Sequence, residues 1–276
     1  MKTLYITDLD GTILNKDKCI PAESLEILNR LIEKGLIFSY ATARSIVSAS
    51  DVTRGLKNIA PVVTGNGVSI VDPQTRAIVS TMDFGMENLE RLIAYMHRYG
   101  LYPLVHSYIN GKEKCSWVQG KETEGMRAWL NESVRKVDYR LNPVKNFEEL
   151  FQGQVFYMTC MGRQADFTEI DRELQREQRY RHFLTKELYD DSYWLEIMPL
   201  EATKACTALK LKEMLGCDRM VCFGDGINDM SLFQAADECY AVANAVEELK
   251  AIATGVIGSN EEGSVAKWLE CNGVKG

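Results

Sequence analysis

Thr7-Asp8-Leu9-Asp10-Gly11-Thr12 follows directly on the apolar residues Leu4-Tyr5-Ile6 near the start of the chain. An apolar run that ends in turn residues is typical of a buried strand in a parallel sheet. The carboxyl end of such a strand is where open α/β sheets bind ligands, and Gly11 permits a turn there. Two carboxylates at this position favour a hard divalent cation such as Mg²⁺. A solvated surface loop is the alternative, and this stretch alone does not decide between them.

A second acidic motif lies far along the chain, in Met220-Val221-Cys222-Phe223-Gly224-Asp225-Gly226-Ile227-Asn228-Asp229. Here too an apolar run ends in a carboxylate. Asp225 and Asp229 are spaced to share one face of the first helical turn after a short loop. An ordinary N-cap is the alternative, but a cap needs one aspartate and neither flanking glycine. The pattern therefore indicates a loop that packs closely against a metal ion or a phosphate.

Two smaller pieces lie between the acidic motifs. Phe38-Ser39-Tyr40-Ala41-Thr42-Ala43-Arg44 is typical of a strand that ends in a hydroxyl, and Thr203-Lys204 begins a predicted helix. A lysine in the first turn opposes the helix dipole, so Lys204 is unfavourably placed unless an anion or a carboxylate lies nearby. A single threonine or lysine is usually structural. The complete order Asp-x-Asp, Thr, Lys, Gly-Asp-x-x-x-Asp is what makes a functional role the better interpretation.

In this order the motifs resemble those of the haloacid dehalogenase superfamily, specifically its Cof-type branch with a type IIB cap. The four motifs of that superfamily correspond to Asp8–Thr12, Ala41–Arg44, Lys204 and Gly224–Asp229. Further segments that resemble the branch are Thr64–Gly67, Val242–Ala245 and Ser259–Ala266. The sequence departs from the usual pattern at Ala43, at Ala205 and in the segment 200–203, but no charged or catalytic group is lost there.

The resemblance implies an α/β fold with a Rossmann-like, doubly wound parallel sheet as its core and an inserted α/β cap domain. We expect a discontinuous core domain in residues 1–83 and 190–276 and the cap domain in residues 84–189. Within the cap, the patterns predict helices over 86–99, 121–137 and 165–179 and strands over 101–108 and 155–160. Five side chains there could contact a substrate or belong to the core: Tyr102, His106, Tyr108, Trp117 and Tyr157.

The resemblance also implies a Mg²⁺-dependent phosphatase that hydrolyses a small phosphorylated metabolite, such as a sugar phosphate, through an aspartyl-phosphate. Asp8 is then the nucleophile, and Asp10 is the general acid and base. The expected Mg²⁺ ligands are Asp8, the backbone carbonyl of Asp10, Asp225 and Asp229. The expected phosphate or substrate contacts are Leu9, Thr42, Ala43, Arg44, Asn66, Lys204 and Asn228. A phosphomutase or other phosphotransferase, and a catalytically silent sugar-phosphate-binding protein, are the alternatives.

Composition restricts the partners. The chain has 276 residues and a formal net charge of −7, and it contains no run of basic residues. We therefore expect neither nucleic acid nor a membrane as a partner. The partner that the resemblance implies is a small-molecule phosphate ester. No apolar stretch reaches the roughly 18 residues needed to span a bilayer. The first residues run straight into a predicted strand, so no signal peptide is expected.

The positions of cysteine and histidine restrict the expected cellular compartment and the kinds of catalytic or metal site to expect. The eight cysteines contain no C-x-x-C, which argues against a zinc or thioredoxin-like site and fits a reducing cytoplasm. The three histidines, His97, His106 and His182, lie away from the acidic motifs. We therefore expect neither a Ser-His-Asp triad nor a histidine-ligated metal at the strand ends.

Overall fold

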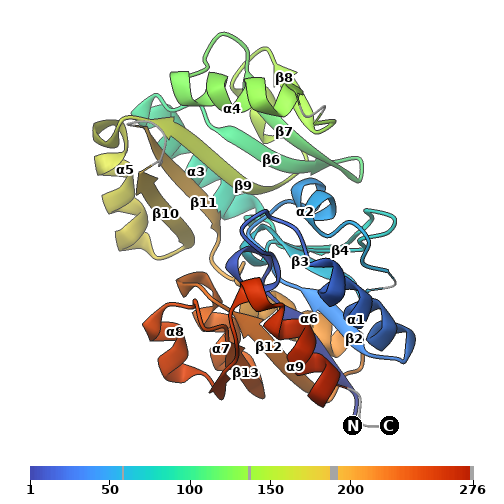
Figure 1. Cartoon of the computed structure of the whole chain (residues 1–276). Helices are drawn as coiled ribbons and strands as arrows, with labels where there is room; N and C mark the ends of the chain where they lie inside the picture. The colour runs from blue at the N-terminus through green and yellow to red at the C-terminus, as the bar shows by residue number, and fades with distance from the viewer. Residues whose placement is uncertain (58, 136–137, 187–191, 274–276) are drawn as a thin grey trace. The chain divides into compact units, whose positions relative to one another are not determined.

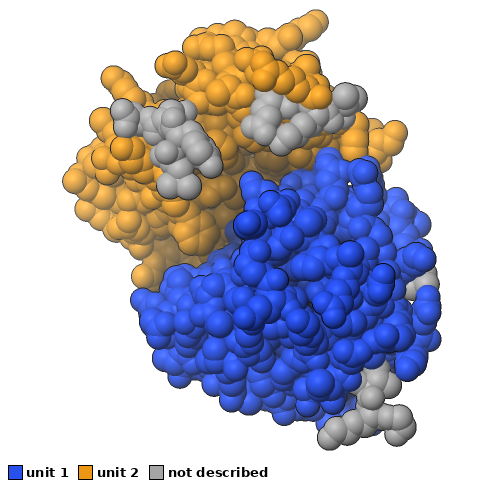
Figure 2. Space-filling view, in the orientation of Figure 1, with its two compact units in different colours: residues 1–80, 203–276 blue, residues 81–202 orange. Residues whose placement is uncertain are grey.

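The computed structural model describes residues 1–57, 59–135, 138–186 and 192–273 (Figure 1). The chain divides into two compact units, which Figure 2 colours separately. Unit 1 contains Met1–Ser80 and Thr203–Gly276, and unit 2 contains Thr81–Ala202. Unit 1 is therefore discontinuous in sequence, whereas unit 2 is one continuous segment.

Unit 1 is built on a parallel five-stranded sheet with the order β14-β13-β12-β1-β2. β1 (Thr3–Thr7) lies in the middle, between β12 (Arg219–Gly224) and β2 (Ile37–Tyr40). β13 (Glu238–Ala241) and β14 (Gly255–Val256) extend the sheet to one edge. β1 and β12 are apolar and buried over nearly their whole length, as strands with both faces covered require. The predicted parallel α/β core is confirmed.

The helices of unit 1 pack in pairs. α1 (Ala22–Glu33) contacts α9 (Ser264–Asn272), and α6 (Lys204–Met214) contacts α7 (Met230–Ala235) (Figure 1). Unit 1 also contains α2 (Ile46–Val52), α8 (Glu247–Ile252) and the short turns η1 (Leu9–Ile13), η2 (Gly65–Gly67), η4 (Ile227–Asp229) and η5 (Asn260–Glu262).

In the described part of both units, no helix has the length and apolar character that a membrane span requires.

A second, three-stranded sheet in unit 1 has the order β3-β4-β5, with β3 (Val62–Thr64), β4 (Ser69–Val71) and β5 (Ile78–Thr81). A hairpin around residues 72–75 connects β4 to β5. The Asp72 amide donates a hydrogen bond to the Ala77 carbonyl at 2.9 Å and closes the turn.

Unit 2 is a six-stranded sheet with the order β10-β11-β9-β6-β7-β8. Its strands are β6 (Leu104–Ile109), β7 (Lys112–Val118), β8 (Leu141–Val144), β9 (Gln154–Gly162), β10 (Tyr180–Lys186) and β11 (Tyr193–Pro199). Its helical segments are α3 (Gly85–Tyr99), α4 (Glu124–Arg135), η3 (Glu148–Phe151) and α5 (Gln164–Glu177). The successive residues Leu104 and Val105 of β6 belong to different buried clusters, one containing side chains of α4 and the other side chains of α3 and α5. Because side chains alternate along a strand, α4 covers one face of the sheet and α3 with α5 cover the other.

The structure moves one boundary of the expected domains. We expected residues 190–276 in the core domain. β11 instead pairs antiparallel with both β9 and β10, so it belongs to the sheet of unit 2, and the chain returns to unit 1 at Thr203. Strand periodicity reveals that a segment is extended but not which sheet it joins. Residues 136–137 of the predicted helix 121–137 lie outside the described residues.

Candidate active site

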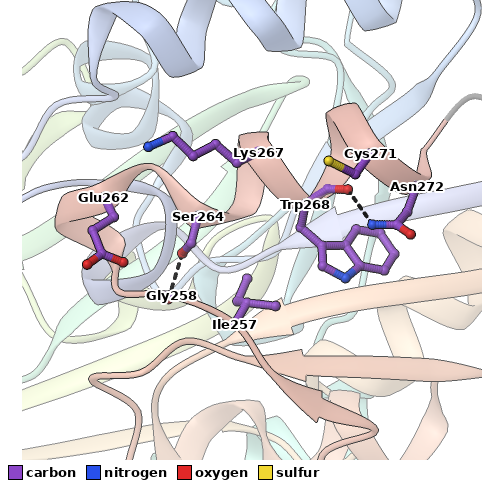
Figure 3. A pocket seen from close by; sticks show the side chains of 8 residues that line it. All are labelled: Ile257, Gly258, Glu262, Ser264, Lys267, Trp268, Cys271 and Asn272. Carbon is purple, nitrogen blue, oxygen red and sulfur yellow. Dashed lines mark hydrogen bonds between the residues drawn. The ribbon is translucent and has the colours of Figure 1, made fainter.

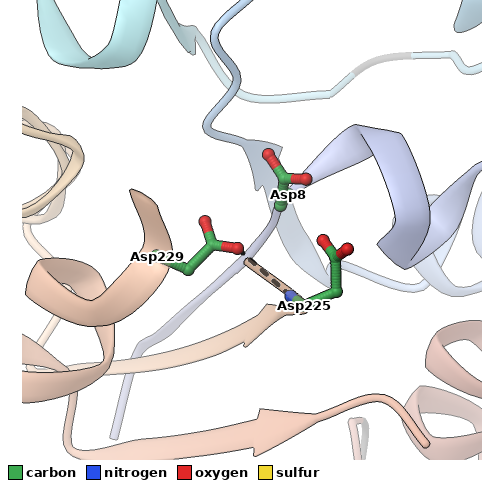
Figure 4. Close-up of side chains that lie close together, drawn as sticks. All are labelled: Asp8, Asp225 and Asp229. Carbon is green, nitrogen blue, oxygen red and sulfur yellow. Dashed lines mark hydrogen bonds between the residues drawn. The ribbon is translucent and has the colours of Figure 1, made fainter. Parts of the chain in front are cut away.

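Three carboxylates meet at the carboxyl ends of two neighbouring strands (Figure 4). Asp8 follows β1, Asp225 follows β12, and Asp229 ends the turn η4. One carboxylate oxygen from each lies within 4.8 Å of the others. Asp8 and Asp229 are buried, and Asp225 is half-buried. The structure therefore brings the two acidic motifs, which are far apart in the sequence, into one group.

Lys204 supplies a buried positive charge to this group. Its Nζ donates hydrogen bonds to Oδ1 of Asp8 at 2.6 Å and to Oδ1 of Asp229 at 2.7 Å. Lys204 is the first residue of α6, where the helix dipole disfavours a cation. The two carboxylates are the nearby anions that such a lysine needs. We call Asp8, Lys204, Asp225 and Asp229 the Lys204 cluster.

The Lys204 cluster contains three carboxylates but one ammonium group. Burial raises the pKa of Asp8 to about 7, and the charge of Lys204 opposes this shift. Burial also raises the pKa of Asp225. Burial lowers the pKa of Lys204, but the charges of Asp8 and Asp229 outweigh it and hold that pKa above its ordinary value. The excess of negative charge and the oxygen-only donors fit a hard divalent cation such as Mg²⁺.

Two glycines leave room for the carboxylates. A Cβ atom at Gly11 would lie 2.3 Å from Oδ2 of Asp225, and the φ angle of Gly11 is +76°. A Cβ atom at Gly224 would lie 2.7 Å from Oδ2 of Asp229. These glycines therefore allow loops and carboxylates to approach one another closely.

Asp10 lies outside the group of three carboxylates. Its carboxylate accepts two hydrogen bonds from Arg44, from Nε at 2.7 Å and from Nη2 at 2.6 Å. Nη1 of Arg44 also donates to Oγ of Ser48 at 2.9 Å, which fixes the guanidinium on α2. Half of the Asp10 side chain is exposed. In this conformation the candidate general acid is paired with Arg44.

The remaining residues that we expected to contact the phosphate or the substrate differ in burial. Thr42 is buried after β2, and its Oγ1 accepts a hydrogen bond from the Arg44 amide at 3.1 Å. Nδ2 of Asn228 lies 3.5 Å from Oδ1 of Asn66, so these two segments meet. Ala43 is exposed, whereas Leu9 is fully buried in the core. Because the Leu9 side chain packs in the core, a contact with substrate would have to come from its backbone.

Three residues that hold the η1 loop received no role in our sequence analysis. Oγ1 of Thr12 donates to Oδ1 of Asp225 at 2.9 Å. Nδ2 of Asn244 donates to the Gly11 carbonyl at 2.7 Å. The Asn260 amide donates to Oδ1 of Asn244 at 3.1 Å, and Nδ2 of Asn260 donates to the backbone carbonyl of residue 14 at 2.9 Å. The sequence did contain evidence for a role of the two asparagines, because both lie in segments that resemble the Cof-type branch.

The side chains of unit 2 for which we left two alternatives open have partners within that unit. The ring of Tyr108 stacks on Phe156 with centroids 4.7 Å apart. Nε1 of Trp117 donates to Glu122 at 3.1 Å. The hydroxyl of Tyr157 donates to Glu196. The ring of Tyr102 packs edge-on against Phe147, and His106 contacts Glu113. These contacts favour a structural role.

Unit 2 contains a second buried charge cluster. Nη1 of Arg140 lies 2.8 Å from Oε1 of Glu113, and Nη2 lies 2.6 Å from Oδ2 of Asp138. Nδ1 of His106 lies 3.7 Å from Oε1 of Glu113. Burial lowers the pKa of His106, but interactions with Cys115 and Glu113 outweigh it and raise that pKa to about 10. We call His106, Glu113, Asp138 and Arg140 the Arg140 cluster.

A surface pocket in unit 1 lies beside α9 and the end of β14 (Figure 3). Its lining residues are Ile257, Gly258, Glu262, Ser264, Lys267, Trp268, Cys271 and Asn272. None of them belongs to the Lys204 cluster or to the predicted site. The pocket is therefore not formed by the residues that we expect to carry out the reaction.

The comparisons with known proteins identify the family. The sequence profile of the haloacid dehalogenase-like hydrolases matches residues 5–269. The chain therefore belongs to the haloacid dehalogenase-like hydrolase family, and the resemblance inferred from the motifs is confirmed.

Relatives with assigned names are phosphatases. A 5-amino-6-(5-phospho-D-ribitylamino)uracil phosphatase of Bacillus subtilis is 26% identical over 98% of this chain and 97% of its own length. An HMP-PP phosphatase of Serratia proteamaculans is 24% identical over 98% of this chain and 95% of its own length. With the family assignment, these relatives support an enzyme that hydrolyses phosphoric monoesters.

Solved structures agree on the fold. The crystal structure of TM0651 from Thermotoga maritima has a TM-score of 0.79 and 22% identity, over 100% of this chain and 99% of that chain. A haloacid dehalogenase-like hydrolase from Bacteroides thetaiotaomicron has a TM-score of 0.73 and 22% identity, over 98% and 99%. The predicted fold class, a Rossmann-like core with a cap, is confirmed.

Proposed function

We propose that this enzyme is a Mg²⁺-dependent phosphatase that hydrolyses a small phosphorylated metabolite through an aspartyl-phosphate on Asp8. The observation that carries the proposal is the Lys204 cluster, in which three carboxylates and one ammonium group meet at the ends of β1 and β12. Such a site offers a nucleophile, a fixed cation and an excess of negative charge that calls for a metal ion. We further propose that unit 2 is the cap domain that selects the substrate.

In the first step, an oxygen of Asp8 attacks phosphorus, and the bond from phosphorus to the leaving oxygen breaks. Asp10 gives its proton to the leaving oxygen. This requires Asp10 to leave Arg44, since its carboxylate is bound on both oxygens in the present conformation. Lys204 keeps Asp8 oriented through its hydrogen bond to Oδ1, so that Oδ2 is the free nucleophilic oxygen.

In the second step, water attacks the phosphorus of the aspartyl-phosphate, and Asp10 accepts the proton that this water loses. The bond between phosphorus and Asp8 breaks, which releases inorganic phosphate and restores the carboxylate. Mg²⁺ held by Asp8, Asp225 and Asp229 would reduce the repulsion between an anionic phosphate and an anionic nucleophile. Thr42, buried at the end of β2, is the proposed hydroxyl contact to the phosphoryl group.

The names of the relatives suggest which esters to test first. One acts on a phosphorylated ribitylaminouracil, and the other acts on HMP-PP. We therefore propose a small organic phosphate as substrate, with sugar phosphates as a further class. The eight cysteines are all unpaired, and this agrees with the cytoplasm as the proposed location.

The test is the release of inorganic phosphate from a panel that contains these esters and sugar phosphates. It is run with Mg²⁺, with a chelator and with the variant Asp8→Asn. Loss of the nucleophile should lower kcat by at least about 10³-fold. The matched control is Asp51→Asn, an exposed aspartate outside the predicted site, which should keep full activity.

Mg²⁺-dependent release that is lost in Asp8→Asn and kept in Asp51→Asn supports the proposal. Transfer of the phosphoryl group to a sugar acceptor, without release of inorganic phosphate, would identify a phosphotransferase instead. Binding of the esters without turnover, by a folded and Mg²⁺-loaded protein, would identify a silent binding protein.

A further inference from the structure

Two cysteines oppose each other directly in the sheet of unit 1. β12 and β13 are parallel, and their register pairs Cys222 with Cys239. The next pair in this register, Phe223 and Tyr240, has stacked rings with centroids 5.9 Å apart, and both rings also contact Trp268 of α9. Because side chains alternate along strands, the two thiols lie side by side on the opposite face of the sheet.

The sheet already holds these two residues at a distance that a disulfide can bridge. Neighbouring strands lie about 4.8 Å apart. Cα atoms joined by a disulfide are usually about 4.4 to 6.8 Å apart. Both cysteines are unpaired.

The surroundings of the two sulfur atoms differ. Interactions with Cys222 and Thr254 lower the pKa of Cys239 to about 6, although burial and the charge of Glu238 oppose this. The Thr254 hydroxyl lies 3.7 Å from Sγ of Cys239. Burial raises the pKa of Cys222 well above its ordinary value. A thiolate is the reactive form of cysteine, so Cys239 is the sulfur that reacts first.

Access favours the same order. Cys239 is 5% exposed, whereas Cys222 is fully buried. β13 also lies next to the short edge strand β14. Cys239 is therefore the more accessible of the two cysteines, and Cys222 reacts from within the sheet.

We propose that Cys222 and Cys239 form a site of reversible oxidation, at which hydrogen peroxide produces a disulfide between β12 and β13. The Cys239 thiolate attacks one peroxide oxygen, the O–O bond breaks, and hydroxide leaves. The product is a sulfenic acid on Cys239. The sulfur of Cys222 then attacks the sulfur of Cys239, so that the S–S bond forms and the S–O bond breaks. The departing hydroxide and the proton of the Cys222 thiol make water.

Two electrons pass from the two sulfur atoms to the peroxide in this sequence. A dithiol reductant returns them by thiol–disulfide exchange. The bridge would join the strand that leads to Asp225 to its neighbour. Three other cysteines, Cys19, Cys206 and Cys271, are exposed and lie outside strands, so they are available for links between molecules.

The test uses the full chain with Cys19, Cys206 and Cys271 replaced by serine, which prevents links between molecules. The folded protein is treated with hydrogen peroxide, its remaining thiols are alkylated, and peptides are analysed by mass spectrometry without reduction. Trypsin leaves both cysteines on the peptide 220–250, since no lysine or arginine lies between them. Additional cleavage before Asp225, Asp229 and Asp237 separates the cysteines unless a disulfide joins them.

We expect linked fragments, a mass about 2 Da lower than that of the dithiol, and the loss of two alkylatable thiols per chain, all reversed by dithiothreitol. The link should be absent in Cys222→Ala and in Cys239→Ala. In Cys222→Ala, a dimedone adduct should accumulate on residue 239, which reports the first step without requiring the second. Cys217→Ala is the matched control, because this buried cysteine is outside the pair and should leave the link intact.

Two results would overturn the proposal. One is a folded protein in which both thiols remain alkylatable after peroxide treatment. The other is a link that forms only when urea is present, since the pairing would then arise from the unfolded chain. Neither readout uses phosphatase activity, so the outcome is independent of the proposed function.

Discussion

Unit 1 and unit 2 each bury a cluster of charged side chains, and the two clusters differ in how their charges are balanced. The Lys204 cluster sets three carboxylates against one ammonium group. The Arg140 cluster sets two carboxylates against a guanidinium and a histidine whose pKa is raised to about 10. The Arg140 cluster thus has two basic side chains for its two carboxylates, whereas the Lys204 cluster has one basic side chain for three carboxylates.

The difference in charge balance distinguishes a candidate binding site from a cluster with a structural role. A buried cluster whose charges cancel needs no ligand, and its hydrogen bonds hold strands in register. A buried cluster with excess charge is costly by itself and becomes favourable when a cation binds. Burial raises the pKa of Asp8 in the Lys204 cluster, while the pKa values of Glu113 and Asp138 in the Arg140 cluster are lowered. These opposite shifts support the proposal that the Lys204 cluster, and not the Arg140 cluster, binds a cation.

The largest expected effect is the decrease in the free energy of unfolding when the buried basic side chain of either cluster is replaced. Lys204→Met leaves Asp8 and Asp229 without a cationic partner, and Arg140→Met leaves Asp138 without its ion pair. Each should lower the free energy of unfolding by about 3 to 5 kcal/mol. The matched controls are Lys210→Met on the exposed side of α6 and Arg163→Met, whose side chain is 84% exposed. Chemical denaturation in metal-free buffer measures all four. A small effect in Arg140→Met would show that the Arg140 cluster is not a structural element.

Mg²⁺ should act on one cluster alone. At a Mg²⁺ concentration of 100 times Kd, binding to the folded state should stabilise the protein by about 2.7 kcal/mol. Asp225→Asn should remove most of this gain, whereas Arg140→Met should lower the starting stability and keep the gain. Thermal unfolding with Mg²⁺ and with a chelator measures the difference. The control is Asp218→Asn, since Asp218 is exposed. An equal gain in Asp225→Asn would place the ion elsewhere.

In metal-free protein, the two clusters should lose their contributions to stability in different pH ranges. The pKa values of Glu113 and Asp138 are lowered in the folded state, so their stabilisation is present above the unfolded pKa values and is lost as the pH falls below about 4. The pKa of Asp8 is raised to about 7, so its contribution is present at low pH and is lost as the pH rises from about 4 to 7. Denaturation midpoints across this range measure both limbs. Asp138→Asn should flatten the acid limb only, and Asp8→Asn should flatten the neutral limb only.

The smallest expected effect on stability is at the Arg44–Asp10 pair. Half of the Asp10 side chain is exposed, so Arg44→Lys should change the free energy of unfolding by less than about 1 kcal/mol. Lysine keeps the charge but cannot hold both carboxylate oxygens in a planar fork. Because the proposed general acid must leave Arg44 before it can carry a proton, the weaker pair should not lower kcat. Arg54→Lys, at an exposed pair on the surface, is the matched control. A large fall in kcat in Arg44→Lys alone would show that Arg44 positions Asp10 for the reaction.

Local sequence patterns were sufficient for the parallel core, and the resemblance to the superfamily implied the meeting of Asp8, Lys204, Asp225 and Asp229. β1 and β12 are apolar runs that end in carboxylates, and the ends of neighbouring parallel strands must lie together. A lysine against the helix dipole required an anion, and the structure supplies two. The proposed roles of these residues remain predictions.

The features that escaped prediction depend on contacts between distant residues. β7, β8 and β10 were missed, because Lys112–Val118 is largely polar and β8 contains Pro143. The Arg140 cluster was missed as well, since Arg140 and Glu113 come together only when β7 pairs with β8. The placement of β11 in unit 2 had the same cause. Each depends on strand pairing, which periodicity within one segment does not encode.

The central position of β1 determines when the site can form during synthesis. β1 gains β2 as a neighbour early, but its other neighbour, β12, exists only after residue 219 has been made. Lys204 and Asp225 likewise come late. Unit 2 is continuous in sequence and can complete its sheet while the ribosome still holds the second half of unit 1. The nascent chain therefore carries Asp8 exposed and without its lysine until the last third of the protein emerges.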